Sequence, residues 1–189
     1  MLNKRKLGIL ALAIVLLGTG TTVVAQIFIS MQSQIGFTLA SNQLMWSATY
    51  DRGSSLDIPC DGFAAANTVI TGDSVSINLK YYGGVAISAT RFVALKAKTV
   101  TAAIPLTWAG TNIGAGVITS AKLIVEFGFE QVKHDVLVWG ANGVCTVQDT
   151  SWMSAFGNNL DTQYLLLTFE ITFVSTSVPM AFSITAPSA

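Results

Sequence analysis

The chain has 189 residues, of which 51% are hydrophobic and 11% charged, with ten acidic and ten basic side chains. Soluble proteins carry about 25% charged residues, so this composition excludes intrinsic disorder, which needs high charge and low hydrophobicity. A formal net charge of zero and the lack of a basic stripe also exclude a nucleic-acid-binding protein. The length suffices for one domain with a sizeable core.

The first 25 residues have the three-part pattern of a secretory signal peptide. Lys4-Arg5-Lys6 supplies a positive start, an apolar run extends from Leu7 to Leu17, and small residues lead to Ala25. We therefore expect a signal peptide at residues 1–25, cleavage after Ala25 and an extracellular protein. Cleavage removes three of ten basic residues, which leaves seven against ten acidic residues and a net charge of −3. The alternative is a retained anchor, because residues 7–29 are long enough to cross a bilayer.

An unusually long amphipathic segment follows the leader. From residue 27 onward nearly every odd position is apolar and most even positions are polar; the apolar residues are Ile27, Ile29, Met31, Ile35, Phe37 and Leu39. An extended strand of this length spans about 43 Å, roughly twice a usual strand. We expect residues 26–36 to form an extended strand that reaches out to the sheet of a neighbouring molecule. An ordinary first strand, or a strand continuing from an anchor helix, are the alternatives.

Alternation with a period of two dominates the rest of the chain. It recurs in segments separated by glycine-rich and asparagine-rich turns; the segments are 74–81, 85–90, 122–130, 132–138, 165–173 and 178–184. This pattern predicts an all-β fold, an antiparallel β-sandwich with a jelly-roll arrangement, as one domain over residues 37–189. In the last segment Pro179 predicts an edge strand. Single helical turns are expected at residues 63–67 and 149–156.

The sequence offers little to catalysis. His134 is the only histidine, and it stands in an alternating strand, where a structural role is favoured over a general base. No motif for a nucleophile, a zinc site or a phosphate loop occurs. Asp51, Asp57 and Asp61 form a loose acidic cluster that matches no EF-hand pattern, so a solvated loop is favoured over calcium binding. We expect no enzyme activity, no cofactor and no metal site.

Two cysteines, Cys60 and Cys145, lie in the exported part of the chain. An even count in an oxidising compartment favours one disulfide, which would close a loop of about 85 residues. Two separate buried thiols are the alternative.

Several short motifs are similar to a known group of surface proteins. They are Phe37-Thr38-Leu39-Ala40-Ser41-Asn42, the run from Gly72 to Leu79 and the run from Gly83 to Thr90. Together with the leader, they resemble the camelysin/TasA-type biofilm-fibre proteins of bacteria and the related bundling pilins of archaea. The resemblance covers the chain from the leader to about residue 95, and it implies secreted jelly-roll subunits that polymerise by donating an N-terminal strand.

Strand length, pattern and resemblance together predict the structural subunit of an extracellular filament at the cell surface. Its partner would be a second copy of the chain, bound head to tail, with neighbouring filaments as further contacts and the membrane only during export. We expect residues 27–35 to leave their own domain and enter the next subunit. The alternatives are an archaeal type IV pilin or archaellin-like subunit with a retained N-terminal helix, a monomeric surface-anchored binding domain, and a weak hydrolase that uses carboxylates such as Asp51 or Asp61.

Overall fold

The computed structural model describes residues 31–39, 43–50, 58–61, 68–81, 84–98, 106–127, 132–148, 164–174 and 181–188. Within these ranges the chain forms β-strands connected by turns. The strands are β1 (Met31–Leu39), β2 (Leu44–Ser47), β3 (Thr49–Tyr50), β4 (Ile58–Pro59), β5 (Thr68–Thr71), β6 (Ser74–Tyr81), β7 (Ala86–Ala97), β8 (Thr107–Gly110), β9 (Ile118–Phe127), β10 (Lys133–Trp139), β11 (Cys145–Val147), β12 (Leu165–Phe173) and β13 (Ala181–Ser188). The described residues include no helix long and apolar enough to cross a membrane.

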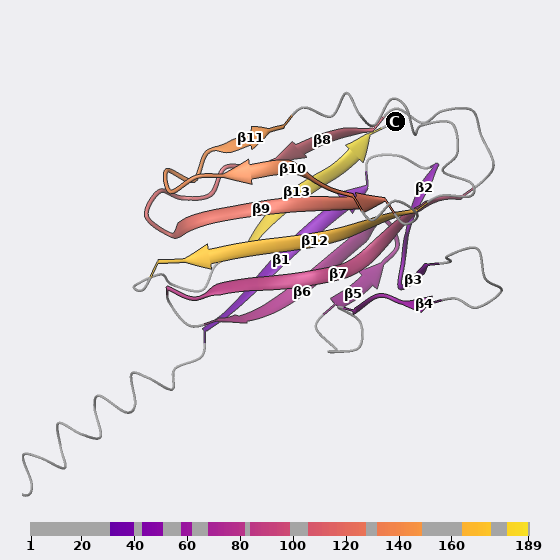
Figure 1. Ribbon diagram of the computed structural model, residues 1–189, viewed down its shortest axis with the longest axis horizontal. Helices are drawn as coiled ribbons and strands as arrows, with labels where there is room; N and C mark the ends of the chain where they lie inside the picture. Colours follow the sequence, from indigo (N-terminus) through magenta and orange to yellow (C-terminus); the bar gives the residue numbers. More distant parts are fainter. Residues whose placement is uncertain are drawn as a thin grey trace, which may run out of the picture. The chain divides into compact units, whose positions relative to one another are not determined.

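The strands form two large sheets and one small one (Figure 1). The five-stranded sheet has the order β5-β6-β1-β13-β8, and the six-stranded sheet has the order β11-β10-β9-β12-β7-β2. Among the strands that the structure describes, β3 and β4 pair only with each other. Every described pairing is antiparallel except that of β1 with β13, which is parallel. The expectation of an all-β fold with antiparallel sheets is confirmed.

Most of the described apolar residues of the alternating segments face one main core. On β6, for example, Val75, Ile77 and Leu79 are buried, whereas Ser74 and Asn78 are exposed. The same cluster of buried side chains contains residues of β1 and β6 from one sheet and of β7, β9, β10 and β12 from the other. Burial of one large aliphatic or aromatic side chain contributes about 1.5–3 kcal/mol, so this shared cluster is the main source of stability for both sheets.

A bulge in β10 overturns part of the expected alternation. The sequence places His134, Val136 and Val138 on one face, but the register with β9 shifts between Asp135 and Leu137. As a result Val136 and Leu137 are both buried in the core, while Val138 is only half-buried. One extra residue in a strand reverses the facing of all residues beyond it, which the alternation alone does not reveal.

The expected edge position of the last strand is wrong. Strand β13 pairs with β1 on one side and with β8 on the other, so it lies inside the sheet. Pro179 precedes the strand and lies outside the described residues, as do the helical turns expected at 63–67 and 149–156. A proline does occur within β13, at Pro187, and there the register with β8 shifts between Thr185 and Ser188. A proline cannot donate a ladder hydrogen bond, which accounts for the irregular pairing at that point.

Candidate functional site

Strand β1 occupies the middle of the five-stranded sheet. Its residue Gln34 lies opposite Asn78 of antiparallel β6 and opposite Ala181 of parallel β13. The described part of the strand begins at Met31, which pairs with Tyr81; Ile27 and Ile29 of the expected polymerisation strand lie outside the described residues. The expected boundary between donor strand and domain, at residues 36 and 37, falls within this one continuous strand.

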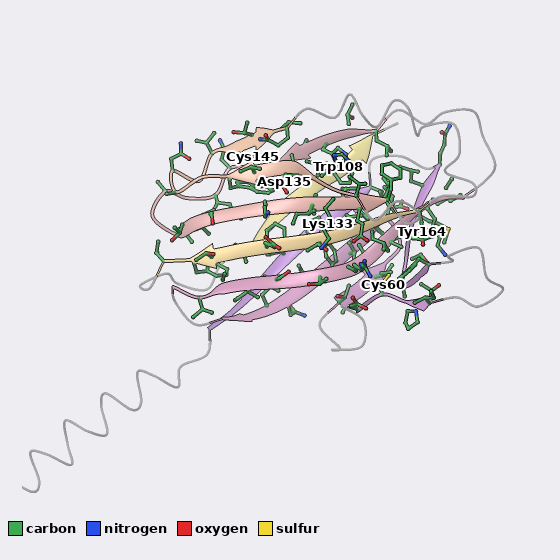
Figure 2. All side chains as sticks on the ribbon, viewed as in Figure 1. Cys60, Trp108, Lys133, Asp135, Cys145 and Tyr164 are labelled. Carbon is green, nitrogen blue, oxygen red and sulfur yellow. The ribbon has the colours of Figure 1, made fainter. Side chains whose placement is uncertain are left out.

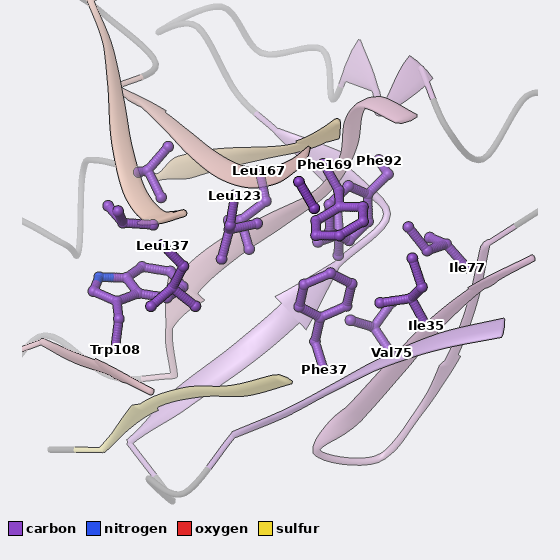
Figure 3. Packing of buried hydrophobic residues seen from close by; sticks show 14 of the residues in the cluster. Ile35, Phe37, Val75, Ile77, Phe92, Trp108, Leu123, Leu137, Leu167 and Phe169 are labelled. Carbon is purple, nitrogen blue, oxygen red and sulfur yellow. The ribbon is translucent and has the colours of Figure 1, made fainter. Parts of the chain in front are cut away.

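One face of β1 is fully inside the core. Ile35 and Phe37 are 0% exposed and Leu39 is 5% exposed, whereas Gln34 and Thr38 face solvent. Figure 3 shows Ile35 and Phe37 beside Val75 of β6, with Phe92 and Phe169 of the other sheet across from Phe37. Ile35, Phe37 and Leu39 are the residues of the expected polymerisation strand whose side chains the structure describes. They pack in the core shared by the two sheets.

Phe37 makes two aromatic contacts across the core. Its ring centroid lies 4.9 Å from that of Phe92 on β7, with the rings tilted by 33°, and 6.0 Å from that of Phe169 on β12, nearly edge to face. Phe169 in turn meets Trp139 of β10 edge to face at 6.1 Å. Such pairs are worth about 0.5–1.5 kcal/mol each beyond area burial. We call the pair Phe92 and Phe169 the aromatic slot.

Phe92 faces the core because β7 carries a bulge. Leu167 of β12 pairs with Val93, but the next pairing is Phe169 with Ala89, so Thr90, Arg91 and Phe92 all oppose Thr168. Phe92 and Val93 are consequently both buried in the core. Arg91, between them and Ala89, has a backbone φ of +44°, the only positive value at a described residue other than glycine. A non-glycine residue in this region is strained by about 1–2 kcal/mol.

Three contacts on the outer face hold the bulge. The Arg91 backbone N–H donates to the Thr168 hydroxyl at 2.9 Å. The Arg91 guanidinium donates through Nε and Nη2 to the two carboxylate oxygens of Glu126, at 3.1 and 2.6 Å. Hydrogen bonding to Glu126 raises the pKa of Arg91 above its already high ordinary value. This pair could not be predicted from the sequence, because nothing in the pattern shows that the arginine of β7 and the glutamate of β9 meet across β12.

A shallow depression of about 320 Å³ lies on the outer face of the same sheet. Lys122 lines it, with Nζ 3.6 Å from Asp135 Oδ1 and 3.4 Å from Glu170 Oε2. Ser88 and Ser120 also line the depression. All three charged ends are well exposed, so each ion pair contributes less than about 1 kcal/mol. The depression thus offers a solvated charge network rather than an enclosed site.

The two cysteines are both free in the structure and lie in different places (Figure 2). Cys60 is buried with Tyr50 and Tyr164 in a second small cluster, and its thiol donates to the Ser47 carbonyl at 3.7 Å. Cys145 is half-buried on β11, against the main core. Burial raises the pKa of the Cys60 thiol to about 12 and also raises the pKa of Cys145. The Cys60–Cys145 disulfide expected from the sequence is therefore not part of this structure.

Of the other candidate residues, the structure describes Asp61 and His134. Asp51 and Asp57 lie outside the described residues, and Asp61 follows Cys60 at the surface. His134 lies half-buried on β10, opposite Val125 of β9. Across the ranges that the structure describes, no three histidine, cysteine or acidic side chains are grouped as metal ligands would be.

Comparison of the chain with protein-family models, with curated proteins and with solved structures gave no match. The geometry of β1 and its surroundings is therefore the basis for inferring a function.

Proposed function

We propose that this chain is the structural subunit of an extracellular filament, and that it polymerises head to tail when strand β1 of one copy enters the next. In this proposal the two large sheets are the halves of a jelly-roll β-sandwich. The camelysin/TasA-type fibre proteins and archaeal bundling pilins, which the N-terminal motifs resemble, are the model for this assembly. The observation that carries the proposal is the central position of β1, the first described strand, between β6 and β13.

Strand exchange preserves every contact of β1. The same residues from a second copy would pair with β6 and β13 in the same register and bury Ile35, Phe37 and Leu39 in the same core. Burial of these three side chains contributes about 5–9 kcal/mol whichever copy supplies them. The balance between the two arrangements then depends on the link after Leu39 and on subunit concentration, as in domain swapping.

The parallel pairing of β1 with β13 is consistent with a strand supplied from another chain. Within one chain, parallel neighbours need a long crossover connection, whereas a strand from another copy has no such constraint. Because Gln34 pairs with Ala181 and Leu39 with Ala186, β1 enters the sheet at the end where β13 begins. A strand entering there from a neighbour gives a directional contact that need not close on itself and can build a filament.

The described sheet edges are poor places for two copies to meet. The outermost strands β5, β8 and β2 have four residues each and β11 has three, all shorter than the usual five or six. Short edge strands limit edge-to-edge pairing. Exchange of an internal strand is therefore the favoured route to chain-to-chain contact.

Engineered disulfides test the proposal by showing which copy supplies β1. Gln34 and Asn78 face solvent from directly opposite positions, and cross-strand Cα separations of about 4.5–5.5 Å suit a disulfide. We suggest Gln34→Cys with Asn78→Cys in a chain with Cys60→Ala and Cys145→Ala, produced with its own leader. Secreted material is then oxidised and separated under denaturing, non-reducing conditions, beside electron microscopy of the same sample.

Strand exchange predicts filaments and a ladder of covalent multimers. The matched control is Val69→Cys with Ser76→Cys, an opposite pair on β5 and β6 that exchange does not separate, and it should give only an internal bond. A Gln34→Cys/Asn78→Cys protein that runs entirely as an internally bonded monomer would contradict the proposal.

A further inference from the structure

We propose that the aromatic slot formed by Phe92 and Phe169 reads the register of the strand that enters the sheet, and that it accepts the aromatic side chain at position 37. The ligand of this site is an extended, alternately apolar segment of a second copy with one phenylalanine at the matching position. The identity of that ligand rests on the proposed strand exchange; the register-reading role of the slot does not. Arg91, Glu126 and Thr168 are positioning residues that hold Phe92 in the slot.

Alternation alone leaves the register of β1 open. A slip of one residue would turn Gln34 and Thr38 into the core, and their polarity opposes that slip. A slip of two residues keeps the same face inward and replaces Phe37 at the slot by Ile35 or Leu39, which are also apolar. A second source of selectivity is therefore needed to distinguish registers that differ by two.

The slot provides that selectivity through shape and aromatic geometry. Phe37 is fully buried and meets one phenylalanine tilted and the other nearly edge to face. An aliphatic side chain in its place would lose both ring contacts and leave space unfilled against Phe92 and Phe169. Two aromatic contacts suffice for a preference of about tenfold or more for the register with phenylalanine at the slot.

The contacts of Arg91 on the outer face explain why Phe92 faces the core and can contact Phe37. Without the bulge, Phe92 and Val93 would point to opposite faces, and only one of them could lie in the core. The strained backbone at Arg91 is held by the Thr168 hydroxyl and by the Glu126 carboxylate, which is 2% exposed. Strain of this kind persists only where the surroundings enforce it.

A variant that moves the aromatic residue tests the slot directly. The substitutions Ser33→Ile, Ile35→Phe and Phe37→Leu transfer the Ile-Phe-Leu pattern of positions 35, 37 and 39 by two residues toward the N-terminus. If position 35 then lies at the slot, it takes the place of position 37 opposite Val75, and position 34 moves from Asn78 to Ser76. The control is Ser33→Ile alone, which adds an apolar residue without moving the phenylalanine.

The measurement is the yield of two alternative disulfides in the full chain lacking Cys60 and Cys145. Gln34→Cys is combined with either Asn78→Cys or Ser76→Cys in the wild-type, control and shifted sequences. We expect a preference for position 78 of about tenfold in the wild-type and control chains, and a preference for position 76 in the shifted chain. A shifted chain that still bonds through position 78, or that shows no preference, overturns the slot as the register-reading site.

The same disulfide assay, separated under denaturing, non-reducing conditions, distinguishes this inference from the proposed function. Which cysteine bonds reports the register, whereas bonding within one chain or between chains reports the source of the strand. A register shift in internally bonded monomers would retain the slot and refute strand exchange; a ladder without a register shift would do the reverse.

A matched pair of variants tests the positioning residues in this assay. Thr168→Val removes the hydroxyl that accepts from the Arg91 N–H, and Thr168→Ser keeps it. We expect the preference for position 78 to fall severalfold in Thr168→Val and to be restored in Thr168→Ser. Equal selectivity in both proteins, with both folded by circular dichroism, would show that the Arg91 bulge does not position Phe92.

Discussion

Arg91 on β7 and Glu126 on β9 form a two-pronged ion pair although β12 separates their strands. The guanidinium is partly exposed and the carboxylate is almost entirely buried. The pair extends over Thr168 of the intervening strand, which also accepts the Arg91 backbone N–H. Arg91 therefore connects three adjacent strands on the outer face of the sheet. The bulge at the same residue places Phe92 in the core.

Glu126→Gln should destabilise the protein by about 2–4 kcal/mol. The substitution keeps the side-chain volume but leaves the arginine without its anionic partner, and breaking one side of a buried pair is costly. Urea unfolding followed by circular dichroism measures the change. Lys122→Gln is the control on the same face of β9, where the exposed pairs should contribute less than about 1 kcal/mol. Equal losses in the two variants would show that burial of Glu126 adds nothing.

The sequence predicts the facing of some strands and not of others, for an identifiable reason. On β6 the alternation of Val75, Ile77 and Leu79 runs without interruption and the expected face is the buried one. On β10 and β7 a bulge inserts extra residues, so adjacent apolar residues such as Val136 and Leu137 share one face. Bulges depend on what the neighbouring strand can pair with, and that partner lies far away in the sequence.

The central place of β1 was also beyond sequence reasoning. The apolar face of Ile35, Phe37 and Leu39 is readable from the alternation, and the structure confirms that these side chains are buried. Their partners on β6 and β13 cannot be read, because pairing between distant segments leaves no local signal. Donation of this strand to a neighbour stays a prediction.

Gly143→Ala should destabilise the protein by about 2–4 kcal/mol. Gly143 has a φ of +73°, and a methyl group there would lie against the carbonyl oxygen of Ile113, whose N–H donates to the Gly143 carbonyl at 2.8 Å. Backbone strain and overpacking therefore add together. Gly72→Ala is the matched control, because its φ is +58° but nothing lies within 4 Å of the added methyl group. Thermal unfolding should show a loss of about 1 kcal/mol for this control, clearly smaller than for Gly143→Ala.

Thiol titration of the purified protein should find two free cysteines after denaturation without reductant. Before denaturation, Cys145 should react with a maleimide well before Cys60, because it is half-buried on a short edge strand while Cys60 is enclosed. Mass spectrometry of labelled peptides identifies the site. Recovery of a Cys60–Cys145 linked peptide from unreduced material would instead support the disulfide expected from the sequence.

Cys60 should make the protein less stable at alkaline pH. Burial raises the pKa of its thiol from 9.0 to about 12, so the folded protein keeps this proton over a range in which the unfolded chain loses it. The unfolded state then binds fewer protons, and the free energy of unfolding falls as the pH rises.

The contribution of the neutral thiol is complete below pH 9 and is lost progressively between pH 9 and about 12. The slope for one such proton is at most about 1.4 kcal/mol per pH unit. The informative quantity is the difference in unfolding free energy between the wild type and Cys60→Ala, in which contributions common to both proteins cancel. That difference, measured by urea unfolding at several pH values, should shrink above pH 9, and a constant difference up to pH 11 would show that the thiol ionises equally in both states.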